Sequence, residues 1–345
     1  MRKDSDPISV VIMAGGRGTR FWPVSTRERP KQFLDLLGEM TMLQLTANRA
    51  RLLSDPEGIF VVAGASHAEL VRAQLPWLPE DNLLLEPVGR NTAACIAWSA
   101  AILRERGRGQ LPMLVIPSDH RVEDGRGFAD TVVGALPAAR DDWLVTIGVT
   151  PRRPATGYGY LKRGDDIGNG AWKVDSFREK PDLTTAASYL EAGGYYWNAG
   201  MFIWLADVVL NGLRRHLPDL AEAASALSAV TAPSMDRYAG LEAISIDYGL
   251  MEKARRVAMV EARFDWDDVG DWIAARRVGA GRGQVMEVES GDCTVWNPDR
   301  LTVLLGVSGL SLVQTGEVTL VMSDSCAQKL KEVVARLERE EPGLV

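Results

Sequence analysis

Short apolar runs alternate with longer amphipathic segments through the first half of this chain, and this alternation constrains the fold more than any other feature. Four runs of the buried-strand type lie at residues 8–13, 58–64, 112–117 and 143–149. Strands that are hydrophobic along their whole length are typical of parallel sheets with helices on both faces. The pattern therefore predicts an α/β fold with a mostly parallel sheet and right-handed crossovers.

Two segments between these runs have the features of helices. Residues 41–53 open with Thr41 and Gln44 at the spacing of a capping box, and apolar residues then recur at roughly helical period. Residues 91–107 are a second candidate. From about residue 157 the chain becomes a series of aromatic, strand-like pieces broken by glycine and proline, which we expect to be excursions attached to the sheet.

A change of composition at residues 277–285, where glycines and arginines replace the apolar periodicity, predicts a domain boundary. We expect residues 1–276 to form one large domain. Residues 285–345 are expected to form a small β unit closed by a helix over residues 326–340. The apolar run 301–313 within this unit indicates burial.

Charge and cysteine content exclude several classes of protein. The 345-residue chain has a formal net charge of −7, which disfavours nonspecific binding to nucleic acid or to an anionic membrane surface. No apolar stretch approaches the roughly 20 residues of a membrane span. Cys95, Cys293 and Cys326 are odd in number and far apart, so neither a disulfide framework nor a zinc site is indicated. We therefore expect a cytoplasmic protein without nucleic-acid or membrane partners.

A glycine-rich, cationic loop follows the first apolar run. Residues 13–33 carry four arginines and one lysine around the sequence AGGRGT, and Glu28 is the only acid. Glycine lets backbone N–H groups converge on an oxyanion at the sheet edge where open α/β folds bind ligands. The P-loop pattern is absent, and the third glycine of the dinucleotide fingerprint would fall on Phe21. A tight turn with solvated arginines would explain a lone GGxG, but the density of cations favours phosphate binding.

The same loop, GGRGTRFWPVSTRERPKQF, resembles the signature of the sugar-1-phosphate nucleotidylyltransferase family, and its PKQF ending resembles the mannose-1-phosphate guanylyltransferase branch. Further segments resemble family motifs in the family's order. They are EPVGRNTAACIA (86–97), VIPSDH (115–120), TGYGYL (156–161), FREKP (177–181), YYWNAGMF (195–202), and ISIDYGLMEK with FDWDDVGDW (244–253 and 264–272). The resemblance implies a Rossmann-like mixed sheet followed by a short left-handed β-helix-like unit. In the family this unit often packs either on a partner, which would give a homodimer, or on the catalytic domain. Members often carry a further cupin-type isomerase domain, which we expect this chain to lack.

The resemblance implies that an oxygen of a sugar 1-phosphate attacks the α-phosphorus of a nucleoside triphosphate, in line with the departing pyrophosphate. Such a nucleophile is already anionic near pH 7, so no general base is required. In the branch named above the substrates are GTP and mannose 1-phosphate. Two alternatives stay open: the same chemistry with another sugar, such as a manno-heptose 1-phosphate, or another nucleotide, and a non-catalytic sugar-nucleotide-binding regulatory subunit.

The resemblance also implies roles for individual residues. It places Mg²⁺ on Asp119 and Asp268; Asp267 is an equal candidate by chemistry, and only the motif alignment prefers Asp268. Asn198 would offer a donor and an acceptor to sugar hydroxyls. The implied catalytic residues are Arg20, Lys31, Asp119, Lys180 and Asp268. The implied nucleotide-binding residues are Ala14, Gly15, Gly16, Arg17, Gly18, Thr19, Glu86, Arg90, Asn91 and Ser118. The implied sugar-phosphate-binding residues are Tyr158, Gly159, Glu179, Lys180 and Asn198.

Overall fold

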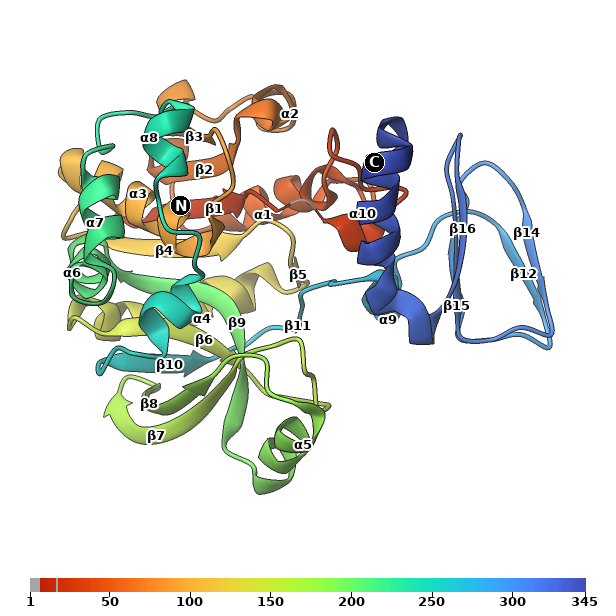
Figure 1. The fold of residues 1–345 in the computed structure, drawn as a ribbon. Coiled ribbons are helices and arrows are strands. Elements are labelled where there is room, and N and C mark those ends of the chain that lie inside the picture. The colour runs from red at the N-terminus through yellow and green to blue at the C-terminus, as the bar shows by residue number, and fades with distance from the viewer. Residues whose placement is uncertain (1–6, 17) are drawn as a thin grey trace. The chain divides into compact units, whose positions relative to one another are not determined.

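The structure is a computed structural model that describes residues 7–16 and 18–345 (Figure 1). The chain divides into two compact units, each built from several segments. Unit 1 comprises the residues up to Gly15, Ala47–Pro117 and Val122–Trp266, and unit 2 comprises Gly16–Thr46, Ser118–Arg121 and Asp267–Val345. The glycine-rich loop thus belongs to the same unit as the C-terminal residues. The division into domains 1–276 and 285–345 stays a prediction.

A nine-stranded mixed sheet forms the centre of unit 1, with the strand order β3-β2-β1-β4-β9-β6-β10-β8-β7. Parallel pairing joins β3, β2, β1 and β4 in succession, and also joins β6 to β10. All pairings of β7, β8 and β9 are antiparallel. The strands are β1 (Ser9–Ala14), β2 (Ile59–Gly64), β3 (Leu83–Glu86), β4 (Pro112–Pro117), β6 (Leu144–Val149), β7 (Tyr160–Gly168), β8 (Ala171–Arg178), β9 (Tyr195–Leu205) and β10 (Val257–Glu261).

The predicted α/β class with a mixed sheet is confirmed. The four predicted strands correspond to β1, β2, β4 and β6, each within one residue of the predicted bounds. The expectation that residues 195–202 form an attached excursion is wrong, because β9 pairs with β4 on one side and β6 on the other. Most side chains of β9 are buried, as they must be in an interior strand. Gly200, with φ of 65°, interrupts its apolar pattern without ending the strand.

Helices pack on the sheet of unit 1. α3, α6 and α7 contact one another, and their apolar residues share a core with Val11, Val62 and Val115 of the sheet. α4 contacts β4, β6, β9 and β10. In the parts of the chain that the structure describes, no helix combines the length and apolarity needed to cross a bilayer. The helices of this region are α2 (Ala68–Gln74), α3 (Asn91–Glu105), α4 (Gly125–Arg140), α5 (Leu183–Ala192), α6 (Ala206–His216), α7 (Pro218–Ser225) and α8 (Met235–Ala239).

Both predicted helices are present. The first is α1 (Met42–Ala50) and the second is α3. The capping box at the start of α1 forms as expected: the Thr41 N–H donates to Gln44 Oε1 at 3.0 Å, and the Gln44 N–H donates to Thr41 Oγ1 at 3.2 Å. These reciprocal bonds satisfy two amides that a helix N-terminus would otherwise leave unpaired.

Unit 2 has its own core, in which three tryptophans meet. The rings of Trp272 and Trp296 lie 5.8 Å apart, and the Phe21 ring lies 5.0 Å from Trp272. Trp22 Nε1 donates to the Leu344 carbonyl at 2.7 Å, so the glycine-rich loop is fixed against the end of the chain. The helices here are α9 (Trp272–Arg277) and α10 (Leu330–Glu340).

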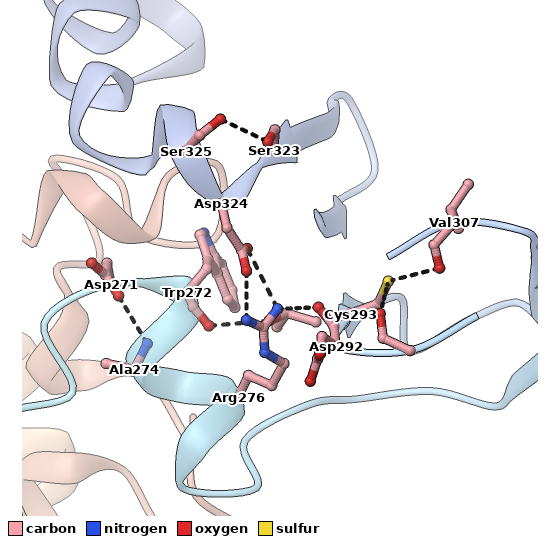
Figure 2. Close-up of polar contacts among 12 residues, drawn as sticks. Asp271, Trp272, Ala274, Arg276, Asp292, Cys293, Val307, Ser323, Asp324 and Ser325 are labelled. Carbon is pink, nitrogen blue, oxygen red and sulfur yellow. Dashed lines mark hydrogen bonds and ion pairs between the residues drawn. The ribbon is translucent and has the colours of Figure 1, made fainter. Parts of the chain in front are cut away.

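Figure 2 shows how α9 is joined to the C-terminal strands of unit 2. Arg276 donates to the Asp292 carbonyl and to the Asp324 carboxylate, the latter at 2.5 Å. Asp271 caps α9 by accepting the Ala274 N–H at 2.8 Å. A charged side chain thus holds together three segments that are far apart in the sequence.

The C-terminal strands stack as in a β-helix. β12 pairs in parallel with β14, and β13 with β15, at a constant offset of 17 residues (285 to 302, 294 to 311). β16 closes the stack antiparallel to β15. Their bounds are β12 (Val285–Val288), β13 (Thr294–Trp296), β14 (Thr302–Leu305), β15 (Leu310–Gln314) and β16 (Thr319–Ser323); the short strands β5 (Arg121–Val122) and β11 (Trp266–Asp267) lie where the chain passes between units.

The expected burial of the run 301–313 is wrong for half of β14. Leu301, Val303 and Leu305 are 55%, 55% and 68% exposed, whereas Leu304 is buried. Successive side chains of a strand point to opposite faces, so an unbroken apolar run in a two-stranded layer leaves every second side chain outside.

Candidate active site

Lys31 lies at the centre of a cluster of expected catalytic residues in unit 2. A 3-10 turn over Lys31–Phe33 buries its side chain. Its ammonium donates to the Asp119 backbone carbonyl at 2.8 Å, to Asp119 Oδ2 at 2.9 Å and to the Asp268 backbone carbonyl at 2.8 Å. A lysine ammonium has three donors, so these contacts use all of them. One buried cation thereby holds together segments that are 88 and 237 residues away from it.

The Asp119 carboxylate remains accessible within this cluster, with 38% of its side chain exposed. Burial raises its pKa, but the Lys31 ammonium and the neighbouring His120 more than offset this, so the pKa lies below its usual value. Asp119 is therefore ionised at neutral pH. An ionised, accessible carboxylate at the end of a strand is suited to hold a divalent cation.

Asp267 and Asp268 differ in their surroundings. Asp267 Oδ1 accepts the Val269 N–H at 2.8 Å, and Oδ2 forms an ion pair with Arg277 at 3.0 Å. Both oxygens of Asp267 are thus bound within the protein. Asp268 Oδ2 lies beside Gly270, where an added Cβ would be 2.8 Å from it and 3.4 Å from a guanidinium nitrogen of Arg20. This geometry brings Asp268 and Arg20 together.

The glycine-rich loop packs closely on Lys31. Gly18 has φ of 62° and ψ of 28°, in the left-handed region, and an added Cβ would lie 2.5 Å from Lys31 Cβ. No other residue fits there without displacing Lys31. The Gly16 carbonyl accepts from Gln32 Nε2 at 2.9 Å, and Thr19 begins the turn that carries Arg20. Arg17 lies outside the described residues.

Three residues that were expected to bind the nucleotide form none of these contacts with Lys31 and instead bond to other parts of the protein. Ser118 is buried beside Asp119, and its carbonyl accepts from Thr46 Oγ1 at 3.2 Å. Arg90 donates to the Ala239 carbonyl, which uses part of its guanidinium within unit 1. Asn91 is exposed, and its Oδ1 accepts the Thr92 N–H at 2.8 Å.

Glu86 forms a buried polar pair in unit 1. It ends β3 and accepts a hydrogen bond from the hydroxyl of Tyr238. Ala14 ends β1, and at the following Gly15 an added Cβ would lie 3.0 Å from Glu86 Oε2. Burial raises the pKa of Glu86 to about 7, which the bond from Tyr238 only partly offsets. Tyr238 was not expected at the site, and no sequence motif marks it.

The five expected sugar-phosphate-binding residues meet in unit 1. The Lys180 N–H donates to the Tyr158 carbonyl at 3.2 Å, and the Asn198 N–H donates to the Gly159 carbonyl at 2.8 Å. Lys180 Nζ donates to Glu179 Oε1 at 2.6 Å. A Cβ on Gly159 would lie 2.5 Å from Glu179 Oε2, so a larger residue would displace the Glu179 carboxylate from its present position. Lys180 itself has φ of 45°, a strained conformation for a side-chain-bearing residue.

The Asn198 side chain has a different environment from the one expected. Its Oδ1 accepts from Thr146 Oγ1 at 2.7 Å and from the Gly200 N–H at 3.2 Å. Its Nδ2 donates to Asp247 Oδ1 at 2.9 Å. The acceptor that Asn198 would offer to a sugar is therefore already used by the protein. Asp247 is a further residue of this cluster; the segment ISIDYGLMEK contains it, but the motif alone assigns it no role.

Among the described residues no group of three or more His, Cys, Asp or Glu side chains is arranged to hold a metal ion. The expected metal site has only two protein carboxylates, those of Asp119 and Asp268. Mg²⁺ commonly binds through one or two carboxylates, with phosphate oxygens and water completing its shell. The hard oxygen donors of this pair fit such an ion.

Known proteins resemble this chain over most of its length. A family model described as nucleotidyl transferase matches residues 9–280, and one described as MannoseP isomerase/GMP-like beta-helix domain matches residues 283–337. Xanthan biosynthesis protein XanB of Xanthomonas campestris pv. campestris is 39% identical over 343 residues, which cover 95% of this chain and 73% of that protein. Mannose-1-phosphate guanylyltransferase RfbM of Salmonella typhimurium is 35% identical over 348 residues, which cover 96% and 72%. The crystal structure described as mannose-1-phosphate geranyltransferase from Thermus thermophilus superposes with a TM-score of 0.89 at 37% identity, over 96% of this chain and 100% of that one.

Proposed function

The chain belongs to the nucleotidyl transferase family, and we propose that it transfers the guanylyl group of GTP to α-D-mannose 1-phosphate, giving GDP-mannose and pyrophosphate. The observation that carries this proposal is the Lys31 cluster, in which one buried ammonium binds both segments that supply the acidic residues of the family motifs. The 35% identity to a mannose-1-phosphate guanylyltransferase along almost the whole chain supports the choice of substrates.

The reaction needs stabilisation of negative charge rather than proton transfer. The sugar phosphate is already largely ionised at pH 7, since its second pKa is about 6. Its oxygen can therefore attack the α-phosphorus without a general base, and the pyrophosphate leaves on the opposite side. We assign the neutralisation of the triphosphate to Arg20 and to the backbone amides of Gly16, Gly18 and Thr19.

Lys31 has a positioning role in this proposal. Because its three donors are bound to Asp119 and to the Asp268 carbonyl, it fixes the Asp119 carboxylate and the backbone of Asp268 instead of contacting phosphate directly. Asp119 and Asp268 are the residues that would hold the divalent ion, which we propose is Mg²⁺. When bound, such an ion neutralises charge on phosphate oxygens.

Lys180 is the cation of the sugar cluster. Its side chain is 58% exposed. Burial is the largest single effect and lowers its pKa, but Glu179, Tyr248 and Asp247 together outweigh it and leave the pKa raised. It is therefore a permanent ammonium at neutral pH, suited to bind the phosphate of the sugar substrate. Tyr158 supplies the backbone carbonyl that holds Lys180 in place.

Glu86 supports guanine as the base. The Watson–Crick edge of guanine presents two neighbouring N–H donors, and a carboxylate offers two acceptor oxygens to such an edge. Glu86 lies beside Gly15, at the end of the strand that leads into the glycine-rich loop, and Tyr238 fixes one of its oxygens. We therefore assign base recognition to Glu86.

We also propose that the chain forms a homodimer in the cytoplasm. The support for a dimer is an apolar face on the β12–β14 pair, made of Met286, Val288, Val303 and Leu305, which are 53%, 44%, 55% and 68% exposed. A contiguous apolar face in water favours association. Light scattering after size exclusion tests it: we expect a mass of about two chains, and replacement of Val303 and Leu305 by threonine is expected to give monomers.

Pyrophosphate release measured over a grid of nucleotides and sugar phosphates tests the proposed activity. The grid combines GTP, ATP, UTP and dTTP with mannose 1-phosphate, glucose 1-phosphate and manno-heptose 1-phosphate. We expect the highest kcat/KM for GTP with mannose 1-phosphate. Preference for another pair would leave the chemistry intact but refute the substrates, and release with no pair would favour the regulatory subunit.

A further inference from the structure

Asp247 lies in the sugar cluster on a π-helical turn, Asp247–Met251. Single π-helical turns occur often at functional sites. Its Oδ1 accepts from Asn198 Nδ2 at 2.9 Å, and the residue as a whole is half-buried. The bond from Asn198 fixes the direction of the carboxylate within the cluster.

The surroundings of Asn198 favour one orientation of its amide. The Gly200 N–H lies 3.2 Å from its Oδ1, and Thr146 Oγ1, which is 2.7 Å from this oxygen, is also 3.1 Å from the Met201 carbonyl. If the amide were flipped, its NH₂ group would face the Gly200 N–H, and its oxygen would face the Asp247 carboxylate. Thr146 is fully buried on β6. The N–H of the Asn198 side chain therefore points at an ionised Asp247.

The charges around Asp247 are unbalanced. From the segment after β8, Glu179 and Lys180 face the cluster, and Glu252 accepts the Glu179 N–H at 3.1 Å. Burial first, and then the Glu179 carboxylate, raise the pKa of Asp247 to about 7, although a backbone hydrogen bond, Lys180 and Asn198 act in the opposite direction. The Glu179 carboxylate thus opposes the ionisation of Asp247, and a ligand that brings hydroxyl groups would stabilise the ionised form with further hydrogen bonds.

We infer that Asp247 accepts a hydrogen bond from a hydroxyl group of the hexose ring and so determines sugar specificity, and that Asn198 positions it for this contact. The inference rests on the proposed function, because it takes the sugar phosphate as the ligand of this cluster. Asn198 is then a positioning residue, and Asp247 is the residue that contacts the sugar.

Monodeoxy analogues of mannose 1-phosphate, lacking the hydroxyl at C2, C3, C4 or C6, test this contact in pairs with variants. The wild-type protein should lose about 10- to 100-fold in kcat/KM with the analogue that lacks the contacted hydroxyl, the effect of a hydrogen bond to a charged group. The kcat/KM of Asp247→Ala for mannose 1-phosphate should be lower than that of the wild type by a similar factor. For the analogue that lacks the contacted hydroxyl, the kcat/KM of Asp247→Ala should fall no further. Its losses with the other analogues should match those of the wild type.

Two further variants and one control separate contact from structure. Asp247→Asn keeps the shape and the bond from Asn198 but removes the charge, so it should show the same selective coupling if Asp247→Ala is poorly folded. Thr146→Val frees the amide of Asn198 and should weaken the coupling in part, through KM more than kcat. Glu242→Gln changes an exposed carboxylate earlier in the same segment and should keep the wild-type pattern.

The inference would be overturned if Asp247→Ala and Asp247→Asn each lowered kcat/KM by the same factor, relative to the wild type, for mannose 1-phosphate and for all four analogues. A carboxylate with a purely structural role would give this result, because it would not distinguish one hydroxyl from another. Failure of the proposed function would look different: the wild-type protein would then not turn over mannose 1-phosphate with GTP at all.

Discussion

Replacing the Glu86 carboxylate by an amide is expected to stabilise the protein at alkaline pH. Glu86 is buried, and its pKa is raised from 4.5 to about 7 because burial penalises the charged form, with the hydrogen bond from Tyr238 opposing this. A pKa that is higher in the folded chain means that the folded chain binds the proton more tightly. The resulting stabilisation is fully present below pH 4.5 and is lost as the pH rises through about 7.

The magnitude follows from the two pKa values. Their difference corresponds to about 3 kcal/mol at about 1.36 kcal/mol for each pKa unit. Between about pH 5.5 and about pH 8.5 the part that is lost is about 2 kcal/mol, because Glu86 of the unfolded chain is already mostly ionised at the lower value. Glu86→Gln cannot ionise and keeps an oxygen that accepts from Tyr238, so its stability lacks this component.

Urea unfolding of the wild-type protein and of Glu86→Gln, followed at several pH values, measures the effect. The variant should gain about 2 kcal/mol relative to the wild type between the two pH limits, while all other titrating groups cancel in the comparison. Parallel stability curves would refute the reasoning, since they would mean that Glu86 ionises with the same pKa in both states.

Three other outcomes follow from the site. Lys180→Ala should mainly raise KM for the sugar phosphate, whereas Arg20→Ala should lower turnover with any sugar; steady-state kinetics with each substrate varied would contradict this if both variants lost both affinities equally. Lys31→Met should lower kcat by about tenfold or more and destabilise the fold by about 1–3 kcal/mol, because two backbone carbonyls and the Asp119 carboxylate lose their donor. Unchanged kinetics and an unchanged free energy of unfolding would count against the positioning role of Lys31. The ratio of kcat/KM between the wild type and Asp247→Asn should rise as the pH passes 7, because Asp247 with a pKa of about 7 becomes the better acceptor; a flat ratio would argue against it.

Much of the parallel half of the sheet could be predicted because its strands are apolar along their whole length and are separated by helices with recognisable starts. The capping box of Thr41 and Gln44 is such a local signal, and it forms as expected. The family resemblance placed Lys31, Asp119 and Asp268 in one site although they are distant in the sequence, and the roles assigned to them stay predictions. Local patterns succeed for the strands and the capping box, where neighbouring residues decide the structure.

The remaining features depend on partners that are distant in the sequence. The central place of β9 follows from pairing with β4 and β6, which no local periodicity encodes. Tyr238 meets Glu86 across 152 residues, and Asn198 meets Asp247 across 49. The exposure of Val303 and Leu305 reflects the thin two-stranded layer of β12 and β14 rather than the apolar character of the run itself.

The central claim is tested most directly by identifying the products of the purified protein with GTP, mannose 1-phosphate and Mg²⁺. Mass spectrometry and a pyrophosphatase-coupled phosphate assay should give GDP-mannose and pyrophosphate in equal amounts. Asp119→Asn and Asp268→Asn should each reduce the rate by about a hundredfold or more, and the double variant should be scarcely slower than either, because both act through one ion. Asp267→Asn should keep most of the activity. Absence of GDP-mannose from the wild-type reaction, or undiminished synthesis by the double variant, would contradict the account.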